Sequence, residues 1–321
     1  MRMVAGLLAF LVSSASVTTY ANTEADAFAW LQTIAAAARQ LNYTGTFIYR
    51  YGNRIETSRI VHMADLEGEH EKLQALDGTP REIIRNNEEV FCYTPSNNVI
   101  TVEKRKVRHA FPGLPTPQQL PALLENYIVR KGEPERVGGF DCQVVILQPK
   151  DSYRYGHKLW ADSKTGLLIK ASMLGEHNQM MDQFMFTQLT IGGPIDRNLL
   201  KPRMAGAEVI QLPDMSSSAP AESGWVAKQL PPGFKKIMEI KRMMPRKKSP
   251  VNHMVFSDGL AAVSVFVEPL ANVKPNPGLT AQGAMNVYTK AVGEHQVTVV
   301  GEVPATTVVQ IGNSIANSKS K

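Results

Sequence analysis

The sequence predicts an α+β protein that is mostly antiparallel β-sheet and is divided into two parts. Three observations support this prediction. A three-strand meander spans residues 142–174, many short strands separated by turn signals precede it, and a polar segment at 213–224 (PDMSSSAPAESG) has the composition of a linker. A chain of 321 residues is long enough for two domains.

The meander indicates what kind of sheet the first part contains. Strands are expected at 142–148, 156–162 and 167–174, with a tight turn at 163–166. Val144 and Val145 are adjacent, so this sheet carries apolar groups on both faces. Such a sheet must be covered on both faces or must wrap around something apolar. We therefore expect a half-barrel wall that encloses a lipid-sized hollow.

The first 21 residues have the pattern of a secretory signal. Arg2 supplies the positive charge, Val4 to Val12 form the apolar run, and Ala21 ends a small-residue cleavage site. An uncleaved anchor is the alternative, but the run is shorter than the roughly 20 residues that a spanning helix needs. Export predicts a periplasmic protein. Loss of Arg2 would lower the formal net charge from +6 to +5, which favours acidic partners.

The first domain is expected at 22–212. Thr23 is predicted to cap a helix whose apolar stripe forms a lid over the sheet. A second, short helix is expected after Thr116, with Gln119 at its capping-box position. The remaining elements are predicted strands at 44–51, 54–63, 72–76, 81–85, 89–94, 99–104 and 181–191.

The second domain is expected at 225–318, after the linker at 213–224. Asp258-Gly259 is a strong hairpin signal between strands at 252–257 and 260–267. Strands at 285–292 and 296–301 form another predicted hairpin, and Pro304 begins a final helix.

The sequence lacks the motifs of common enzymes and metal sites. It contains no H-E-x-x-H, G-x-S-x-G, C-x-x-C, Walker or G-x-G-x-x-G pattern, and its seven histidines lack ligand spacing. We therefore expect no enzyme activity, no cofactor and no metal. Cys92 and Cys142 both lie in predicted strands; export permits a disulfide between them, and two buried free thiols are the alternative.

Two basic clusters remain, at 104–108 and at 235–248. The second contains seven basic residues and one acid, Glu239. A charge run is usually a solvated face, but this one is dense enough to meet an acidic peptide or lipid phosphates. Nucleic acid is not expected as a partner of an exported protein.

Several stretches resemble the MucB/RseB family of periplasmic regulators of the sigma-E-type envelope-stress pathway. They recur in family order over nearly the whole mature chain: 41–43 (LNY), 76–82 (LDGTPRE), 142–146 (CQVVI), 153–162 (YRYGHKLWAD), 230–234 (LPPGF), 256–260 (FSDGL) and 300–304 (VGEVP). The resemblance implies a LolA/LolB-like unclosed β-barrel with helices in its mouth and a smaller C-terminal α/β domain. It also implies that the chain binds the periplasmic domain of an inner-membrane anti-sigma factor and shields it from proteolysis until lipid or lipopolysaccharide releases it.

These expectations assign two sets of residues. The predicted lipid-binding residues on the barrel wall are Phe47, Tyr49, Phe91, Tyr93, Val145, Leu147, Trp160, Phe184 and Phe186. The predicted partner-binding residues are Trp225, Phe234, Lys235, Lys236, Arg242, Arg246, Lys247, Lys248, Phe256, Asp258 and Gly259. A periplasmic lipid or lipoprotein carrier is the alternative function, although a carrier needs no second domain. The sequence leaves a homo-oligomer open.

Overall fold

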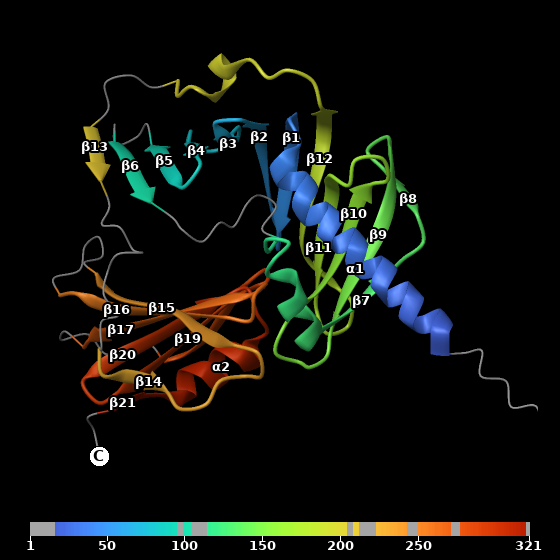
Figure 1. Ribbon diagram of the computed structural model, residues 1–321. Coiled ribbons are helices and arrows are strands. Elements are labelled where there is room, and N and C mark those ends of the chain that lie inside the picture. The colour runs from blue at the N-terminus through green and yellow to red at the C-terminus, as the bar shows by residue number, and fades with distance from the viewer. Residues whose placement is uncertain are drawn as a thin grey trace, which may run out of the picture.

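The computed structural model describes residues 17–94, 99–104, 114–203, 208–211, 223–242, 249–270 and 277–318. Two sheets dominate it, and each carries one long helix (Figure 1). Among the described residues, no helix has both the length and the apolar character needed to cross a membrane. The signal segment and the linker fall largely outside the described residues.

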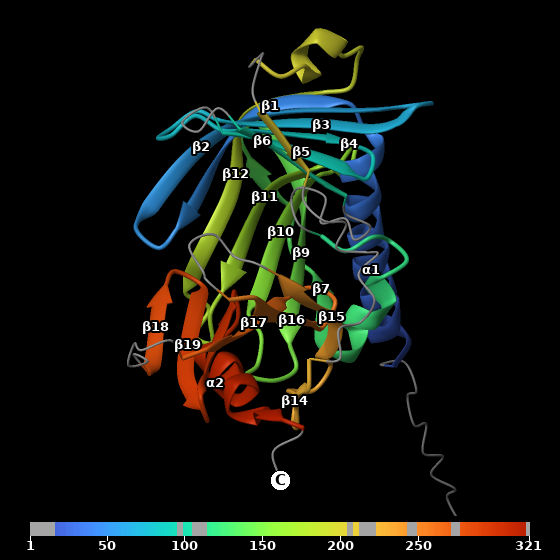
Figure 2. The same cartoon turned by 90° about the vertical axis from the view of Figure 1, so that its left-hand side faces the viewer.

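The N-terminal sheet has 13 strands in the order β13-β6-β5-β4-β3-β2-β1-β12-β11-β10-β9-β7, with β8 paired to β9. All neighbours are antiparallel except β13 and β6. The strands are β1 (Tyr43–Tyr51), β2 (Arg54–Asp65), β3 (Gly68–Ala75), β4 (Glu82–Asn86), β5 (Glu89–Thr94), β6 (Val99–Lys104), β7 (Tyr127–Lys131), β8 (Glu135–Val137), β9 (Phe140–Pro149), β10 (Gly156–Asp162), β11 (Leu168–Leu174), β12 (Met180–Ile191) and β13 (Glu208–Gln211). The sheet bends without closing, so that β2–β6 cross above the ends of β9–β12 (Figure 2). The predicted meander and unclosed barrel are confirmed.

Helix α1 (Val17–Gln40) lies across the face of this sheet that we call the inner face. Ala27, Leu31 and Ile34 are fully buried there against strand residues such as Leu159 and Phe184. The helix begins six residues before the predicted cap at Thr23, because residues 17–22 contain no proline or glycine to end it. The predicted short helix is a 3-10 helix, η2 (Leu120–Glu125), preceded by a hydrogen bond from the Thr116 N–H to Gln119 Oε1 at 3.0 Å.

The opposite, outer face carries a strap formed by 195–203, including η3 (Arg197–Leu200). Lys72 fixes this strap, because its ammonium donates to the Lys201 carbonyl at 2.7 Å and pairs with Glu82 at 3.1 Å. Leu200 packs on Val61 and Met63 of β2. The outer face of β2–β4 is therefore covered by a local segment.

The C-terminal sheet has the order β15-β16-β17-β20-β19-β18. Its elements are β15 (Lys235–Arg242), β16 (Val251–Ser257), β17 (Ala262–Pro269), β18 (Gly278–Gln282), β19 (Met285–Val292), β20 (His295–Gly301) and α2 (Ala305–Ser314), beside a two-stranded pair of β14 (Trp225–Ala227) and β21 (Ile315–Asn317). Helix α2 packs closely on β19 because position 312 is glycine: a Cβ there would lie 2.6 Å from the Tyr288 ring. Both predicted hairpins are present, whereas β15 was not predicted because its charges concealed the strand pattern.

Candidate functional site

A cavity of about 480 Å³ lies where the inner face of the N-terminal sheet meets the C-terminal sheet. Its N-terminal wall comes from β1, β7, β10, β11 and β12, and its C-terminal wall comes from β17, β19 and β20 and the turns beside them. The lining is mostly apolar, with Leu159, Leu168 and Ala171 facing Leu260 and Met285. A partly apolar cavity of this size with a few polar groups is typical of a small-molecule site.

The cavity exists because α1 covers only part of the inner face. Phe47, Phe186, Val145 and Leu147 form the core under the helix, with T-shaped contacts from Phe47 to Phe184 and to Phe186. Further along the same face, Tyr49 and Phe184 line the cavity. Six of the nine predicted lipid-binding residues therefore lie on the inner face, and two of these six line the cavity.

The other three predicted lipid-binding residues lie on the outer face. Trp160 packs with Val144 and Ile169 there, and its indole N–H donates to Glu135 at 2.8 Å. The register places Phe91 of β5 opposite Ile84 of β4, and the same row continues through Lys72 of β3 to Val61 of β2 on the strap side. Tyr93 lies two residues after Phe91 on β5 and therefore shares the outer face. The prediction that all nine line one hollow is therefore wrong for Phe91, Tyr93 and Trp160. Strand alternation gives the faces within each strand, but the register between strands decides which faces coincide.

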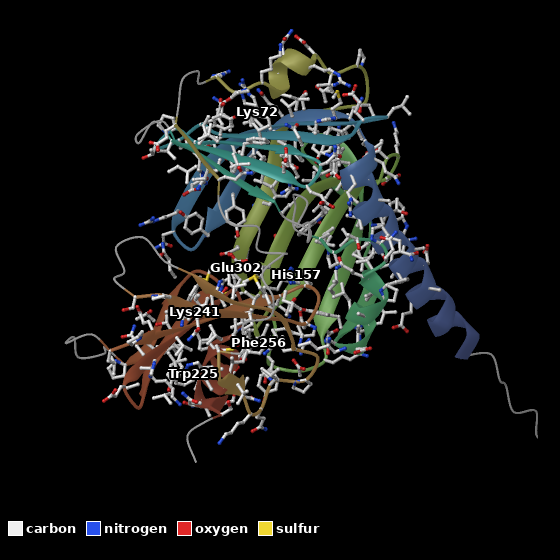
Figure 3. The ribbon with its side chains drawn as sticks, turned by 60° about the vertical axis from the view of Figure 1, so that its left-hand side comes forward. Lys72, His157, Trp225, Lys241, Phe256 and Glu302 are labelled. Carbon is white, nitrogen blue, oxygen red and sulfur yellow. The ribbon has the colours of Figure 1, made fainter. Side chains whose placement is uncertain are left out.

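Polar groups gather at one end of the cavity. The Tyr49 hydroxyl donates to Asp182 Oδ2 at 3.3 Å, and Asp182 is 4% exposed. Burial raises the pKa of Asp182, and the nearby N–H groups of Ala284 and Gly52 offset this only in part. Glu302 keeps an exposed side chain at the mouth, yet desolvation and then the charge of Asp182 raise its pKa. Figure 3 shows Glu302 and His157 between the two sheets.

His157 contributes no positive charge to the cavity near neutral pH. Burial lowers its pKa to about 4, because the protein around the imidazole disfavours the charged ring. The ring lies 6.3 Å from that of Tyr127, which also lines the cavity. Sequence reasoning missed His157, Asp182 and Glu302, because nothing in their local patterns distinguishes them from surface residues.

One buried arginine joins the two domains beside the cavity. Arg154 Nη1 donates to Asp258 Oδ2 at 2.6 Å, and neither side chain is exposed. Its Nε donates to Asp151 Oδ1 at 3.0 Å and its Nη2 to the Pro232 carbonyl at 2.5 Å. The guanidinium also lies 5.4 Å from the centre of the Phe234 ring. Asp258 is therefore an interdomain residue in this structure.

Helix α2 reinforces this junction. Thr307 Oγ1 donates to the Tyr153 carbonyl at 2.7 Å, and Asn286 donates to the Tyr155 hydroxyl at 3.1 Å. The loop before β10 thus contacts the hairpin turn at 258–259, the Pro-Pro-Gly turn and α2. Three of the stretches that resemble the MucB/RseB family, at 153–162, 230–234 and 256–260, meet at this junction.

The predicted partner-binding aromatics do not form a surface. Trp225, Phe234 and Phe256 are 1–4% exposed and belong to the core between the C-terminal sheet and α2. Large aromatics beside a hairpin commonly fill a domain core in this way, and the role of these three residues in partner binding stays a prediction. Gly259 is exposed at the turn with φ +100°, where glycine is required.

The basic residues on β15 behave as expected for a solvated edge. Lys235 and Lys236 are exposed, and Lys236 pairs with Glu239, which also accepts a hydrogen bond from the Ser223 hydroxyl. The side chain of Arg242 and residues 246–248, together with the basic cluster at 105–108, lie outside the described residues. Their predicted role in partner binding stays a prediction.

The two cysteines are not bridged. Cys92 is on β5 and Cys142 on β9, with seven strands between them in the sheet order. Burial raises the pKa of the Cys142 thiol to about 11, so it is protonated and unreactive at neutral pH. Of the two alternatives, free thiols describe this structure.

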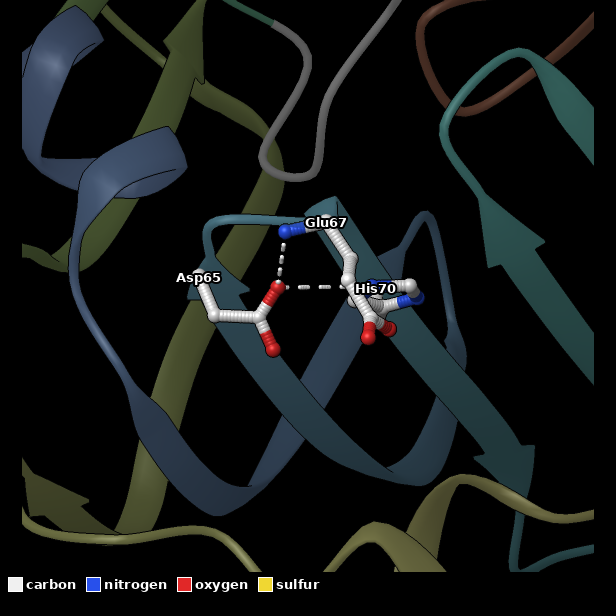
Figure 4. Close-up of side chains that lie close together, drawn as sticks. All are labelled: Asp65, Glu67 and His70. Atoms are coloured by element: carbon white, nitrogen blue, oxygen red, sulfur yellow. Dashed lines mark hydrogen bonds and ion pairs between the residues drawn. The ribbon is translucent and has the colours of Figure 1, made fainter.

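Asp65, Glu67 and His70 form a cluster with metal-ligand geometry on the β2–β3 hairpin (Figure 4). Arg197 already pairs with both acids: it donates to Asp65 Oδ2 at 2.5 Å and to Glu67 Oε2 at 2.7 Å. These contacts balance one of the two negative charges and hold the strap against the hairpin. A structural ion pair therefore explains the cluster.

Family models match both parts of the chain. The MucB/RseB N-terminal domain matches residues 26–204, and the MucB/RseB C-terminal domain matches residues 219–316. The sigma factor AlgU regulatory protein MucB of Pseudomonas aeruginosa is 32% identical over 92% of each chain. The sigma-E factor regulatory protein RseB of Haemophilus influenzae is 25% identical over 88% of each chain.

Solved structures agree with these matches. The complex structure of Pseudomonas aeruginosa MucA/MucB contains a chain with a TM-score of 0.74 and 30% identity, covering 92% of this chain and 100% of that one. A crystal structure of MucB alone gives a TM-score of 0.64 at 29% identity, over 91% of this chain and 98% of that one. The chain therefore belongs to the MucB/RseB family.

Proposed function

We propose that this chain is a periplasmic sigma-factor regulator that binds the periplasmic domain of an inner-membrane anti-sigma factor. In this role it protects that partner from regulated proteolysis, and lipid or lipopolysaccharide promotes release. The observation that carries the proposal is the likeness, over 92% of the chain, to MucB as found in the MucA/MucB complex. The likeness spans both domains of the chain.

The cavity supports the lipid-responsive part of this proposal. It is bounded by both domains, so its volume depends on how they are arranged. A ligand that binds one arrangement more tightly shifts the population toward it, and any partner that prefers the other arrangement is weakened by the same factor. Burial of each methylene of a chain in such a site contributes about 0.8 kcal/mol.

A direct binding experiment tests the regulator role. The chain from residue 22 would be titrated with the purified periplasmic domain of the anti-sigma factor from the same organism, and cleavage of that domain by its first regulatory protease would be followed in parallel. We expect a saturable complex and slower cleavage. A folded chain that neither binds this domain nor slows its cleavage would contradict the proposal.

The carrier alternative makes a different prediction. A carrier would co-purify with lipoproteins from a membrane extract, and a regulator with a single-span inner-membrane protein. The interdomain junction favours the regulator, because one side of the cavity is closed by a second domain that simple carriage does not require. Mass spectrometry of the co-purified material distinguishes the two.

A further inference from the structure

The outer face of the N-terminal sheet carries rows of basic and apolar side chains beyond the part that the strap covers. Strands β2, β1, β12, β11, β10, β9 and β7 are consecutive in the sheet, and their register aligns the outer side chains in rows. The first row crosses all of these strands, which is roughly 29 Å at about 4.8 Å from strand to strand. It contains, in strand order, Ile55, Arg50, Gln183, Ser172, Lys158, Ile146 and Arg130.

The second row adds a cation beside a tryptophan. Lys170 of β11 lies between Met185 of β12 and Trp160 of β10. The ammonium groups of Lys170 and Lys158 lie 4.3 Å and 4.6 Å from the centre of the Trp160 ring. Cation–π contacts of this kind hold both lysines on the outer face. Arg59 of β2 extends the basic surface toward the strap.

The cations of this face outnumber its carboxylates. Glu135 pairs with Lys158 at 2.7 Å, and Asp77 and Glu176 lie at the borders. The other four cations form no ion pair with a carboxylate of the described residues, and all but the lysine are exposed. They are Arg50, Arg59, Arg130 and Lys170.

Partly exposed apolar side chains lie between these cations. Ile48 and Met185 are half-buried and opposite each other, and Ile55, at the end of the first row, is 61% exposed. Cations and apolar groups on one surface are typical of proteins that lie in a membrane interface, where the cations meet lipid phosphates and the apolar groups enter the headgroup region. A soluble acidic partner would use the cations alone.

We infer that this outer face docks on a bilayer surface that contains anionic phospholipid. The free cations meet the phosphates, and Ile55 enters the headgroup layer. The interdomain cavity lies on the inner face of the same sheet, so docking does not occupy it. The inference goes beyond the proposed function: it places the chain on the membrane that anchors the proposed partner, and it does not depend on release by lipid.

Vesicle sedimentation with the chain from residue 22 tests this inference. Vesicles of phosphatidylglycerol and phosphatidylethanolamine would be compared with vesicles of phosphatidylcholine at several salt concentrations. We expect the chain to bind the anionic vesicles, and salt to weaken that binding, because the attraction is electrostatic. The neutral vesicles should bind weakly.

Two double variants with the same loss of charge assign the binding to a surface. Arg50→Ser/Arg59→Ser should weaken vesicle binding at least about tenfold. Lys235→Ser/Lys241→Ser, on the exposed basic edge at β15, should weaken it less than about threefold, because that edge is not part of the proposed docking face. All four side chains are exposed, so we expect both variants to fold.

A change of one apolar residue separates a bilayer from a soluble acidic partner. Ile55→Ser should weaken vesicle binding at least about threefold and leave the binding of polyglutamate unchanged, because only a bilayer accepts the apolar side chain. Leu279→Ser, at a leucine on β18 that is 47% exposed, should change neither affinity.

Three results would overturn the inference: no binding of the anionic vesicles, equal weakening by the two double variants, or an unchanged vesicle affinity in Ile55→Ser. The second result would assign the binding to net charge, and the third would leave the face as a site for a soluble acidic partner. The test of the proposed function contains no membrane, so its failure is distinguishable from the failure of this inference.

Discussion

The two sheets of this protein cover their apolar faces in different ways. In the C-terminal domain, one face of six strands is filled by α2, the β14–β21 pair and aromatics such as Phe256. In the N-terminal domain, one helix lies across a much wider sheet and leaves about 480 Å³ unfilled at the junction. The N-terminal sheet has more apolar surface than α1 can cover, and the uncovered part provides a binding cavity. The C-terminal sheet and α2 match in size and provide a packed scaffold.

The largest expected effect comes from breaking the contact that joins the two regions. Arg154→Met removes the partner of the fully buried Asp258, and leaving one charge of a buried pair costs about 3–5 kcal/mol. We expect a lower urea midpoint and separate transitions for the two domains. Arg154→Met/Asp258→Asn should recover part of the loss, because the stranded charge is then gone and Asn keeps the acceptor that the Leu260 and Ala261 N–H groups use. A loss below about 1 kcal/mol in the single variant would show that the junction is loose in solution.

A matched methionine pair sharpens the comparison between filled core and cavity wall. Met254 is fully buried beside Phe256, so Met254→Ala should cost about 2–5 kcal/mol. Met285 is half-buried at the cavity, so Met285→Ala should cost less than about 1 kcal/mol, because it enlarges a space that is already open. Urea unfolding of both variants measures the difference. Equal losses would mean that the cavity is filled by protein in solution.

Asp182, the buried carboxylate of the cavity, should make the free energy of unfolding depend on pH. The folded-state pKa of Asp182 is raised, so folding favours the protonated carboxyl. Its contribution to the free energy of unfolding is complete below the ordinary pKa of about 3.9 and is lost as the pH rises through the folded-state pKa. Asp182→Asn should therefore raise the free energy of unfolding at pH 7 relative to the native chain, and this advantage should vanish as pH falls toward 3.9. Unfolding curves across this range measure it. The opposite slope would show that Asp182 is paired with a cation.

The smallest expected effect on stability concerns the basic run. Replacing Arg242, Arg246, Lys247 and Lys248 by serine should change the free energy of unfolding by less than about 0.5 kcal/mol, because the sequence predicts a solvated charge run and such charges contribute little to stability. If these residues meet an acidic partner, association should slow at low salt and its salt dependence should flatten. Stopped-flow association at several ionic strengths measures this. Unchanged rates would leave the run an ordinary solvated edge.

Local patterns predicted the elements better than they predicted the site. Strand β10 begins and ends where its alternation and the flanking turn place it, and the Asp258-Gly259 turn joins β16 and β17 as expected. The face of the sheet on which Trp160 lies could not be predicted, because it depends on the register across several strands. The burial of Phe256 could not be predicted either, because core and surface aromatics have the same local pattern. Asp182 and Arg154 were not found at all, because their partners lie in distant segments and only folding brings them together.

One measurement tests the link between the cavity and regulation most directly. The affinity of the chain for the anti-sigma periplasmic domain would be determined with and without saturating lipopolysaccharide. We predict that this amphiphile weakens the complex at least about fivefold, the lower end of typical allosteric coupling. An affinity that is the same with and without the amphiphile, while the amphiphile is bound, would contradict the account.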